Sequence, residues 1–363
     1  MTTVDQPTID MNTIDEEKLG AFMGQAVVDV GASMAAPLLI IGEKLGLFKA
    51  MMKAGPLTSC EVADRAGTSE RYTREWLRGQ AAGGYVSYDA GTDTYTLPDE
   101  HALALAVDDS PFYILGVYPM VASVFADVET LAERFRTGQG FGWHEHDPRL
   151  FTATELFFRP GYAANLVPQW LPMLDGVVDK LEAGAKVADI GCGHGVSTVL
   201  MAKAFPNSKF HGFDYHDKSV ERARELAEEE GVGAQCTFEV AGAQDFPGDG
   251  YDLITHFDCL HDMGDPVGAA RHAREVIAED GSWMIVEPMA ADTVQENLTP
   301  VGRLYYNAST MICTPASLSQ DIGLALGAQA GEAALRQVAE QGGFTRFRRA
   351  TETPFNLILE ARP

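Results

Sequence analysis

Short apolar runs alternate with stretches of helical periodicity between residues 186 and 287. The runs expected as strands are 186–190, 209–213, 236–240, 251–256 and 282–287, and the helices expected between them are 196–204, 217–231 and 266–278. Strands and helices that alternate in this way form a parallel sheet with helices packed on its faces. The alternation therefore predicts an α/β fold for the C-terminal half of this chain of 363 residues.

The end of the chain breaks this alternation. Residues 344–350 and 355–361 both have strand character, and only residues 351–354 separate them. A link this short joins antiparallel neighbours, because a parallel pair needs a crossover of a dozen or more residues. We expect the sheet to close with an antiparallel hairpin.

Glycine and acidic residues follow the expected strands at the edge where ligands bind in open α/β sheets. Asp189-Ile-Gly-Cys-Gly-His-Gly195 comes directly after the first strand, and its glycines permit a tight turn and close approach of a ligand. Asp214 ends the second strand, where a carboxylate can accept hydrogen bonds from two ribose hydroxyls. Asp245 and Phe246 follow the third strand and could meet an adenine amine and ring. A glycine-rich turn alone can be a plain turn, so the combination carries the inference.

Together these features resemble the class I S-adenosylmethionine-dependent methyltransferases over residues 184–363. The resemblance implies a seven-stranded Rossmann-like sheet whose last strand is antiparallel, and S-adenosylmethionine as the cofactor. The loop spacing differs from the G-x-G-x-x-G of dinucleotide-binding dehydrogenases. The cofactor contacts that the resemblance implies are Asp189, Gly191, Gly193, Gly195, Asp214, Tyr215, Asp245, Phe246 and Phe257.

A second motif, Leu260-His261-Asp262-Met263, follows the fourth strand and resembles the Leu-His-Asp-Trp segment of the plant-type small-molecule O-methyltransferases. In that family the His is the general base, and a Glu at the place of Glu287 orients it. The family's second Glu is replaced here by Gln329, with Glu332 three residues on, which departs from a complete His–Glu–Glu set. From the residues alone, His261 could instead be an inert side chain at a helix start, and Glu287 a carboxylate that holds a loop.

The N-terminal third has the pattern of a winged helix. Helices are expected at 60–66 and 70–83, and two short β runs at 85–88 and 94–97. The plant-type enzymes carry a similar domain in front of the sheet. Leu45-Gly-Leu-Phe48, Arg71-Tyr-Thr-Arg-Glu-Trp-Leu77 and Pro315-Ala-Ser-Leu-Ser-Gln320 also resemble an uncharacterised actinobacterial group of winged-helix methyltransferases. The expected parts are a winged-helix dimerisation domain (1–105), a helical connector and substrate lid (106–180) and a cofactor-binding domain (181–363).

Two helices are expected ahead of the winged helix. Thr13 and Glu16 have capping-box spacing, so the first helix should start there, and a second should run over 34–52. Residues 26–41 are interrupted by polar side chains and Pro37, so we interpret them as buried helix, too short to span a bilayer. Because the second helix is apolar nearly all round, it needs burial on more than one side, which a homodimer interface would provide.

Aromatic side chains are concentrated in the connector, on both sides of a glycine-rich break at 138–142. Most are expected in helix cores, and a minority should face the substrate. The substrate candidates there and beyond the fifth strand are Phe157, Phe158, Tyr162, Tyr305 and Tyr306. Residues 144–147, His-Glu-His-Asp, could bind a metal, but no third ligand group is assignable, so a lid or solvated loop without metal is expected. Cys313 has no assignable base partner and is interpreted as core.

Charge and cysteine usage limit the partners and the compartment. The chain carries 52 acidic and 27 basic residues, a net charge of −25, which argues against nucleic acid and anionic membranes as partners. Residues 1–100 alone carry 8 basic and 15 acidic residues, whereas a DNA reader should be basic. Five scattered cysteines and the polar segment Met1–Asp15, which lacks signal-peptide features, favour a reducing cytoplasm.

The combined expectation is a cytoplasmic, homodimeric enzyme. It would transfer a methyl group from S-adenosylmethionine to a hydroxyl or amine of a small apolar or aromatic molecule, with His261 as general base. The alternative is a DNA-binding winged-helix regulator that responds to S-adenosylmethionine.

Overall fold

The structure is a computed structural model that describes residues 9–363, so the first eight residues of the Met1–Asp15 segment lie outside the described residues. The chain divides into two compact units, Met1–Val107 and Asp108–Pro363. The aromatic connector belongs to the second unit, together with the sheet.

The first unit contains the expected winged helix. Its elements are η1 (Met11–Thr13), α1 (Glu16–Lys44), α2 (Leu47–Met51), α3 (Ser59–Ala66), α4 (Glu70–Ala82), β1 (Ser87–Asp89), β2 (Thr94–Thr96) and α5 (Asp99–Leu105). Thr58 and Glu61 form a capping box that starts α3. The indole N–H of Trp76 on α4 donates to the Leu38 carbonyl at 2.9 Å, which fixes α4 against α1. The helix, turn, helix and hairpin order confirms the prediction.

One continuous helix replaces the two expected N-terminal helices. α1 runs for 29 residues and passes through Pro37. Its N-cap is Asp15, whose carboxylate accepts hydrogen bonds from the backbone N–H of Glu17 and Lys18, both at 3.1 Å. The expected capping box at Thr13 and Glu16 is therefore wrong, because Thr13 ends a separate 3₁₀ turn.

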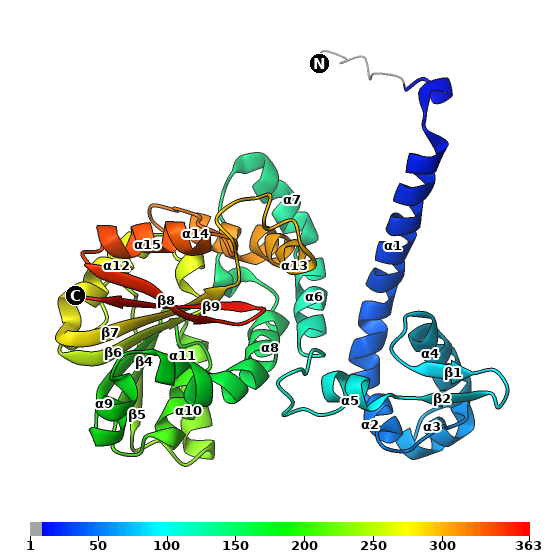
Figure 1. The fold of residues 1–363 in the computed structure, drawn as a ribbon, viewed down its shortest axis with the longest axis horizontal. Coiled ribbons are helices and arrows are strands. Elements are labelled where there is room, and N and C mark those ends of the chain that lie inside the picture. The colour runs from blue at the N-terminus through cyan, green and yellow to red at the C-terminus, as the bar shows by residue number, and fades with distance from the viewer. Residues whose placement is uncertain (1–8) are drawn as a thin grey trace. The chain divides into compact units, whose positions relative to one another are not determined.

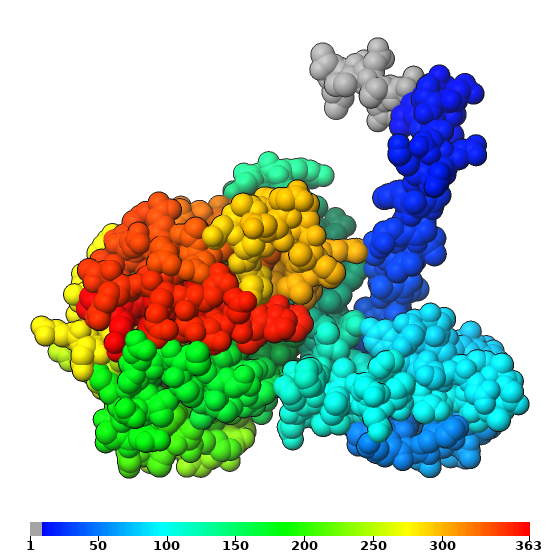
Figure 2. Space-filling model, viewed as in Figure 1, coloured from blue at the N-terminus to red at the C-terminus, as the bar shows by residue number. Residues whose placement is uncertain are grey.

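α1 is also not the buried helix that the sequence predicts, since only Ala36, Leu39 and Gly42 are buried along it. Figure 2 shows the visible face of its N-terminal half uncovered by the rest of its unit. Within residues 9–363, α1 is the one helix whose length and composition would allow it to cross a membrane, a test that core helices of soluble proteins also pass. The expectation that residues 26–41 are too short and too interrupted to span a bilayer is therefore wrong as far as helix length and composition are concerned.

The second unit is built on a seven-stranded sheet of order β5-β4-β3-β6-β7-β9-β8 (Figure 1). The strands are β3 (Lys186–Ile190), β4 (Lys209–Asp214), β5 (Cys236–Val240), β6 (Tyr251–Phe257), β7 (Ile277–Pro288), β8 (Arg346–Glu352) and β9 (Asn356–Arg362). β3 to β7 pair in parallel, and β9 pairs antiparallel with both β7 and β8. The expected seven-stranded sheet with an antiparallel last strand is confirmed.

Helices cover both faces of this sheet. The helices of the second unit, only some of which pack on the sheet, are α6 (Val117–Ala126), α7 (Val128–Thr137), η2 (Trp143–Glu145), α8 (Arg149–Asn165), η3 (Leu166–Trp170), η4 (Leu171–Met173), α9 (Val177–Ala183), α10 (Val196–Ala204), α11 (Asp217–Glu229), η5 (Leu260–Asp262), α12 (Pro266–Val276), α13 (Pro300–Ala308), η6 (Ser309–Cys313), α14 (Thr314–Leu318) and α15 (Gly331–Gln341). Along β7, Met284 and Val286 join the core shared with α10 and α11, while Trp283 and Ile285 join the core shared with α12 and α15. This alternation buries both faces and leaves the carboxyl ends of β3, β4 and β6 free to form a site.

Candidate active site

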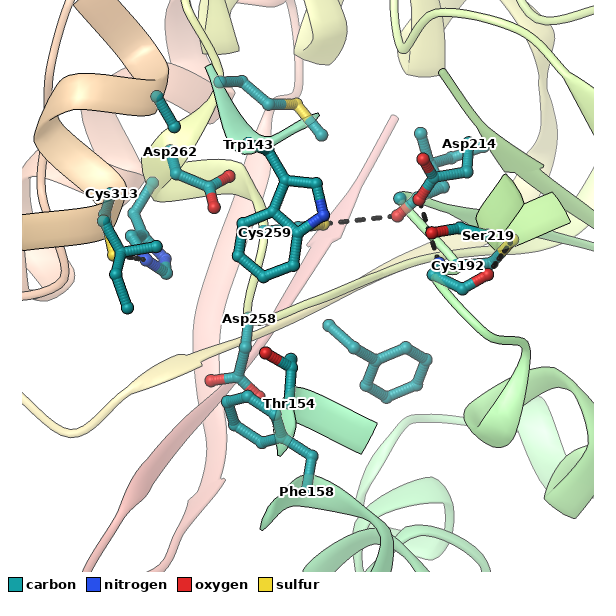
Figure 3. A pocket seen from close by; sticks show the side chains of 18 of the residues that line it. Trp143, Thr154, Phe158, Cys192, Asp214, Ser219, Asp258, Cys259, Asp262 and Cys313 are labelled. Atoms are coloured by element: carbon teal, nitrogen blue, oxygen red, sulfur yellow. Dashed lines mark hydrogen bonds between the residues drawn. The ribbon is translucent and has the colours of Figure 1, made fainter. Parts of the chain in front are cut away.

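A cavity of about 790 Å³ lies at the carboxyl ends of β3, β4 and β6, and all of its lining residues belong to the second unit. Figure 3 shows Asp214 and Cys192 on one side of the cavity, and Asp262 and Cys313 on the opposite side. The sequence-predicted site residues that line it are Gly191, Gly193, Asp214, Tyr215, Asp245, Phe257, Phe157, Phe158, Tyr162, His261 and Tyr305. Those outside the lining are Asp189, Gly195, Phe246, Glu287 and Tyr306.

Asp189 lies beneath the glycine turn and is turned away from the cavity. Its carboxylate accepts hydrogen bonds from three hydroxyls, Ser197 at 2.7 Å, Thr198 at 2.6 Å and Thr255 at 2.9 Å. Burial raises the pKa of Asp189, and the three hydroxyls act in the opposite direction. The side chain thus fixes the start of α10 to β3 and β6, and it contributes to the site by holding the turn.

The glycine turn itself needs the left-handed backbone at Gly191, Gly193 and Gly195, with φ of 69°, 53° and 79°. Asp214 lines the cavity beside the turn, and it accepts hydrogen bonds from the N–H of Gly193 at 2.9 Å and of His216 at 2.8 Å. These bonds use one lone pair on each oxygen, so further acceptor capacity remains for ribose hydroxyls. The turn and the carboxylate fit a nucleoside of the expected kind.

Phe246 does not reach the cavity. It is 1% exposed and packs against Phe213 and His272, at ring-centroid distances of 5.3 and 4.5 Å. Its expected stacking on adenine is inconsistent with this position, because the core beneath the sheet buries the apolar ring. Asp245, the preceding residue, is exposed and lines the cavity, and so does Tyr215.

His261 and Glu287 are brought together as the resemblance implies. His261 lies on η5 after β6, Glu287 lies near the end of β7, and the Glu287 carboxylate contacts Nδ1 of the imidazole. A second partner was missed: Nε2 of His261 lies 3.2 Å from Sγ of Cys313. Cys313 ends the π turn η6 and is buried in a hydrophobic cluster, as expected of a core residue, but the expectation that it has no base partner is wrong. Gln329, where the plant-type family has its second Glu, instead donates to the carbonyls of Met289 and Ala328.

Two further carboxyls face the same part of the cavity. Asp258 has a left-handed backbone (φ 50°) and accepts hydrogen bonds from the hydroxyl of Tyr162 at 2.6 Å and the amide of Asn356 at 3.1 Å. Burial raises the pKa of Asp258 and of Asp262 to about 7. Sequence reasoning missed Asp258, although its place at the end of a central strand was a usable signal.

Aromatic rings form much of the remaining wall. The ring of Phe158 stacks on that of Tyr162 with 5.5 Å between the ring centroids, and the centroids of Tyr162 and Phe257 are 5.4 Å apart. Tyr305 lines the cavity with its hydroxyl bound to the Phe355 carbonyl, whereas the neighbouring Tyr306 lies outside the lining. Two more aromatic residues line the cavity, Trp143 and Phe151, and their signal was the aromatic run after the glycine-rich break.

The expected alternatives for residues 144–147 can now be compared with their contacts. His146 bonds to Asp127 at 2.7 Å, Glu145 accepts from the N–H of Gly142, and Asp147 pairs with Arg149, so these side chains have separate partners. Among the described residues, a different set, His261, Asp262 and Cys313, places its ligand atoms within 4.8 Å of one another, close enough to hold a metal.

The glycine turn, Asp214 and His261 all lie within residues 181–343, which match the family model of a methyltransferase domain. The chain carries a methyltransferase domain. Residues 33–107 match the model of an Rv2258c-like winged HTH domain, in agreement with α3, α4 and the hairpin. At the level of the domain, the predictions of a methyltransferase, of its fold and of S-adenosylmethionine as cofactor are confirmed.

Known relatives of the methyltransferase domain act on varied molecules. The 27-O-demethylrifamycin SV methyltransferase of Amycolatopsis mediterranei is 29% identical over 131 residues, which is 34% of this chain and 48% of that protein. The structure of the mitomycin 7-O-methyltransferase has a TM-score of 0.69 at 18% identity, covering 96% of this chain and 100% of that chain. The structure of human N-acetylserotonin methyltransferase in complex with S-adenosylmethionine has a TM-score of 0.64 at 17% identity, covering 98% of this chain and 99% of that chain.

The sequence relatives and the solved structures match different portions of this chain. The chain spans about half the length of the curated relatives it matches, within the methyltransferase domain. The solved structures extend over nearly the whole chain, and at this identity they show a shared fold.

Proposed function

We propose that this protein transfers a methyl group from S-adenosylmethionine to a hydroxyl, or alternatively an amine, of a small apolar or aromatic molecule. The observation that carries the proposal is that His261, held from behind by Glu287, lies on the wall of a cavity whose opposite side holds the glycine turn and Asp214. A candidate proton acceptor and a candidate nucleoside site therefore line one cavity.

The chain's own residues divide the binding work between the two sides. Gly191, Gly193 and Asp214 would hold the cofactor, with Asp245 and Tyr215 beside them. When bound, S-adenosylmethionine supplies an electrophilic methyl group on a sulfonium. The protein has to align an acceptor with that group, and such alignment can lower a barrier by about 7–11 kcal/mol.

His261 is the candidate general base. Glu287 engages Nδ1, which orients the ring, so Nε2, which neighbours Sγ of Cys313 at 3.2 Å, is the nitrogen that would take the proton. An acceptor hydroxyl placed there would lose its proton to Nε2 as the oxygen is methylated, and a positioned base of this kind contributes about 10²–10⁴-fold.

The side chains that line the cavity indicate the class of methyl acceptor. Phe157, Phe158, Tyr162 and Tyr305 present ring surface, and few cationic side chains line the cavity. A planar apolar molecule with one reactive hydroxyl suits such a wall. The relatives named above, which act on a rifamycin, a mitomycin and N-acetylserotonin, support a small-molecule acceptor.

A homodimer and a reducing compartment are part of the proposal. α1 carries an exposed apolar stripe with alternating spacings of three and four residues, the pattern of a helix that pairs with another helix. The stripe consists of Met23, Val27, Val30 and Met34, at spacings of four, three and four residues, and of Ile41, seven residues further along the same face. All five cysteines are free, which supports the cytoplasm.

The test is an acceptor screen with cofactor labelled in its methyl group. A panel of phenols, aromatic alcohols and aromatic amines is incubated with the full chain, and labelled products are detected by mass spectrometry. His261→Ala should abolish most of the labelling, whereas His101→Ala, in the first unit, should not. Equal labelling of any acceptor by wild type and His261→Ala would remove His261 as the base, and no transfer to any acceptor class would count against the proposed reaction.

A further inference from the structure

Cys313, His261 and Glu287 form a connected row at the cavity wall. Sγ of Cys313 lies 3.2 Å from Nε2 of His261, and the carboxylate of Glu287 contacts Nδ1 of the same ring. The three residues come from η6, η5 and β7, so the fold itself brings them together. A nucleophile within reach of a base that a third group orients is the arrangement of an activated nucleophile.

The other cavity thiols lack this arrangement. Cys259 donates to the Ile190 carbonyl at 3.3 Å, and Cys192 has only a long contact, 3.9 Å, with the Gly193 carbonyl. Burial raises the pKa of both of these thiols well above the ordinary value. Among the described thiols, Cys313 is therefore distinguished by a neighbouring imidazole.

The groups around His261 favour its protonated form. Glu287 touches the ring, and the carboxyls of Asp258 and Asp262 face the same part of the cavity. Burial lowers the pKa of His261, but the contacts with Glu287 and Cys313 together outweigh this effect, so the pKa stands well above its ordinary value. An imidazolium next to a sulfur stabilises the thiolate, which is the reactive form of cysteine.

We propose that Cys313 is a covalent modification site for planar α,β-unsaturated carbonyl compounds, the chemical class that includes quinones. The aromatic wall of Phe158, Tyr162 and Tyr305 suits a flat molecule, and the thiol faces the same space. Sγ forms a bond to the β-carbon, the π pair of the C=C bond becomes a double bond between the α-carbon and the carbonyl carbon, and the π pair of the C=O bond moves onto oxygen. His261 delivers the former thiol proton to that oxygen, which gives the enol. The thioether product covers His261 and closes the cavity to a methyl acceptor.

The experiment measures the reactivity of each thiol with N-ethylmaleimide, a small unsaturated carbonyl compound. The full chain is treated at about pH 6, where ordinary thiols with a pKa of about 8.5 are almost wholly protonated, in buffer that contains a chelator. Peptide mass spectrometry gives a separate rate for each of the five cysteines. We expect Cys313 to react at least about tenfold faster than Cys192 and Cys259, which line the same cavity, and faster than exposed Cys60.

Two variants separate activation from simple exposure. His261→Gln and Glu287→Gln should slow Cys313 by about tenfold and leave Cys60 unchanged, because only the imidazolium is lost or weakened. Thermal unfolding of each variant verifies that it is folded. A Cys313 rate equal to that of Cys259, or an unchanged rate in a folded His261→Gln protein, would overturn the proposal. The readout needs neither an acceptor nor methyl transfer, so its failure is distinct from failure of the proposed function.

Discussion

At the level of single residues, the protonation of His261 decides how the proposed enzyme responds to pH. Burial lowers the pKa of His261, and Glu287 and Cys313 raise it by more, so the net shift is upward from 6.5. A base must be neutral to accept a proton. We therefore expect kcat/KM to rise with pH through a value above 6.5, higher than an unperturbed imidazole would give, and to be lost as pH falls below it.

Glu287→Gln provides the matched variant for this pH profile, since it removes the contact that raises the pKa of His261 most. The acidic limb of the kcat/KM profile of this variant should move to lower pH. The profile is measured with an acceptor from the screen. A limb that stays in place in Glu287→Gln, or that lies below 6.5 in the wild type, would show that a different group titrates.

Asp214 should dominate the affinity for the cofactor product. Asp214→Ala would leave buried ribose hydroxyls and the N–H of Gly193 without their acceptor, at a cost of about 1–3 kcal/mol. Calorimetry with S-adenosylhomocysteine should show a fall in affinity of about tenfold or more. Asp217→Ala, at the exposed start of α11, is the control and should bind normally. Unchanged affinity in folded Asp214→Ala would exclude Asp214 from the site.

Sequence reasoning at this scale succeeded where a residue lies next to a strand end. Asp214 and His261 could be placed because parallel strands bring their carboxyl ends to one edge. Cys313 could not, because its partner His261 lies 52 residues away along the chain. Asp258 directly follows β6 and was missed in spite of that signal, while its partner Tyr162, 96 residues away, could not be predicted. Phe246 was misplaced because a sequence does not show on which side of the loop the apolar ring packs.

At the level of elements, the start of the winged helix depends on close packing of α1 against α4. A Cβ added at Gly42 would lie 2.7 Å from Cζ2 of Trp76 and 3.2 Å from the Phe48 ring. Overpacking of this kind lowers the free energy of unfolding by about 1–3 kcal/mol. Gly42→Ala should therefore lower the thermal unfolding temperature of the first unit. Differential scanning calorimetry of the full chain measures this change.

Gly79→Ala is the control for this prediction. Gly79 lies exposed inside α4 with nothing within 4 Å of the added Cβ, so the substitution should stabilise the helix by about 0.5–1 kcal/mol. If both alanines shifted unfolding in the same direction, tight packing at Gly42 would not be the cause.

The elements of the sheet were predictable because their apolar periodicity is strong and turns separate them. The same reasoning failed for α1, where Asp29 and Pro37 were read as interruptions of a long helix. Both residues lie inside the continuous helix, and Pro37 removes only one backbone donor in a segment with many remaining bonds. The prediction gave single helix-breaking residues more importance than the long run of helical periodicity that surrounds them.

At the level of the whole molecule, the exposed stripe of α1 should determine the oligomeric state. We expect the wild type to sediment as a dimer at micromolar concentration, and Val30→Glu to sediment as a monomer, because a charge in a helix pair remains unpaired. Val28→Glu is the matched control, since Val28 and Val30 are exposed to 65% and 63% but only Val30 belongs to the stripe. A monomeric wild type would contradict the proposed dimer.

The winged helix should not bind DNA. Arg71 and Arg74 on α4 are paired with Glu75 and Glu70, at 2.6 and 3.1 Å, and residues 1–100 carry more acidic than basic side chains. Fluorescence polarisation with a random duplex at low salt should show no binding. Binding that weakens as salt rises would instead favour the regulator.

The π turn at Ser309–Cys313 ties the chemistry of the cavity to the number of residues in one helix. A π turn holds one residue more than an α-turn, and η6 lies between α13 and α14 without a break. Deletion of one residue, such as exposed Thr310, would convert this stretch to regular helix and rotate the residues on one side of it by about 100° relative to the other. The thiol would then leave the imidazole. A single three-nucleotide deletion or insertion is therefore enough for related genes to lose or gain the contact between Cys313 and His261.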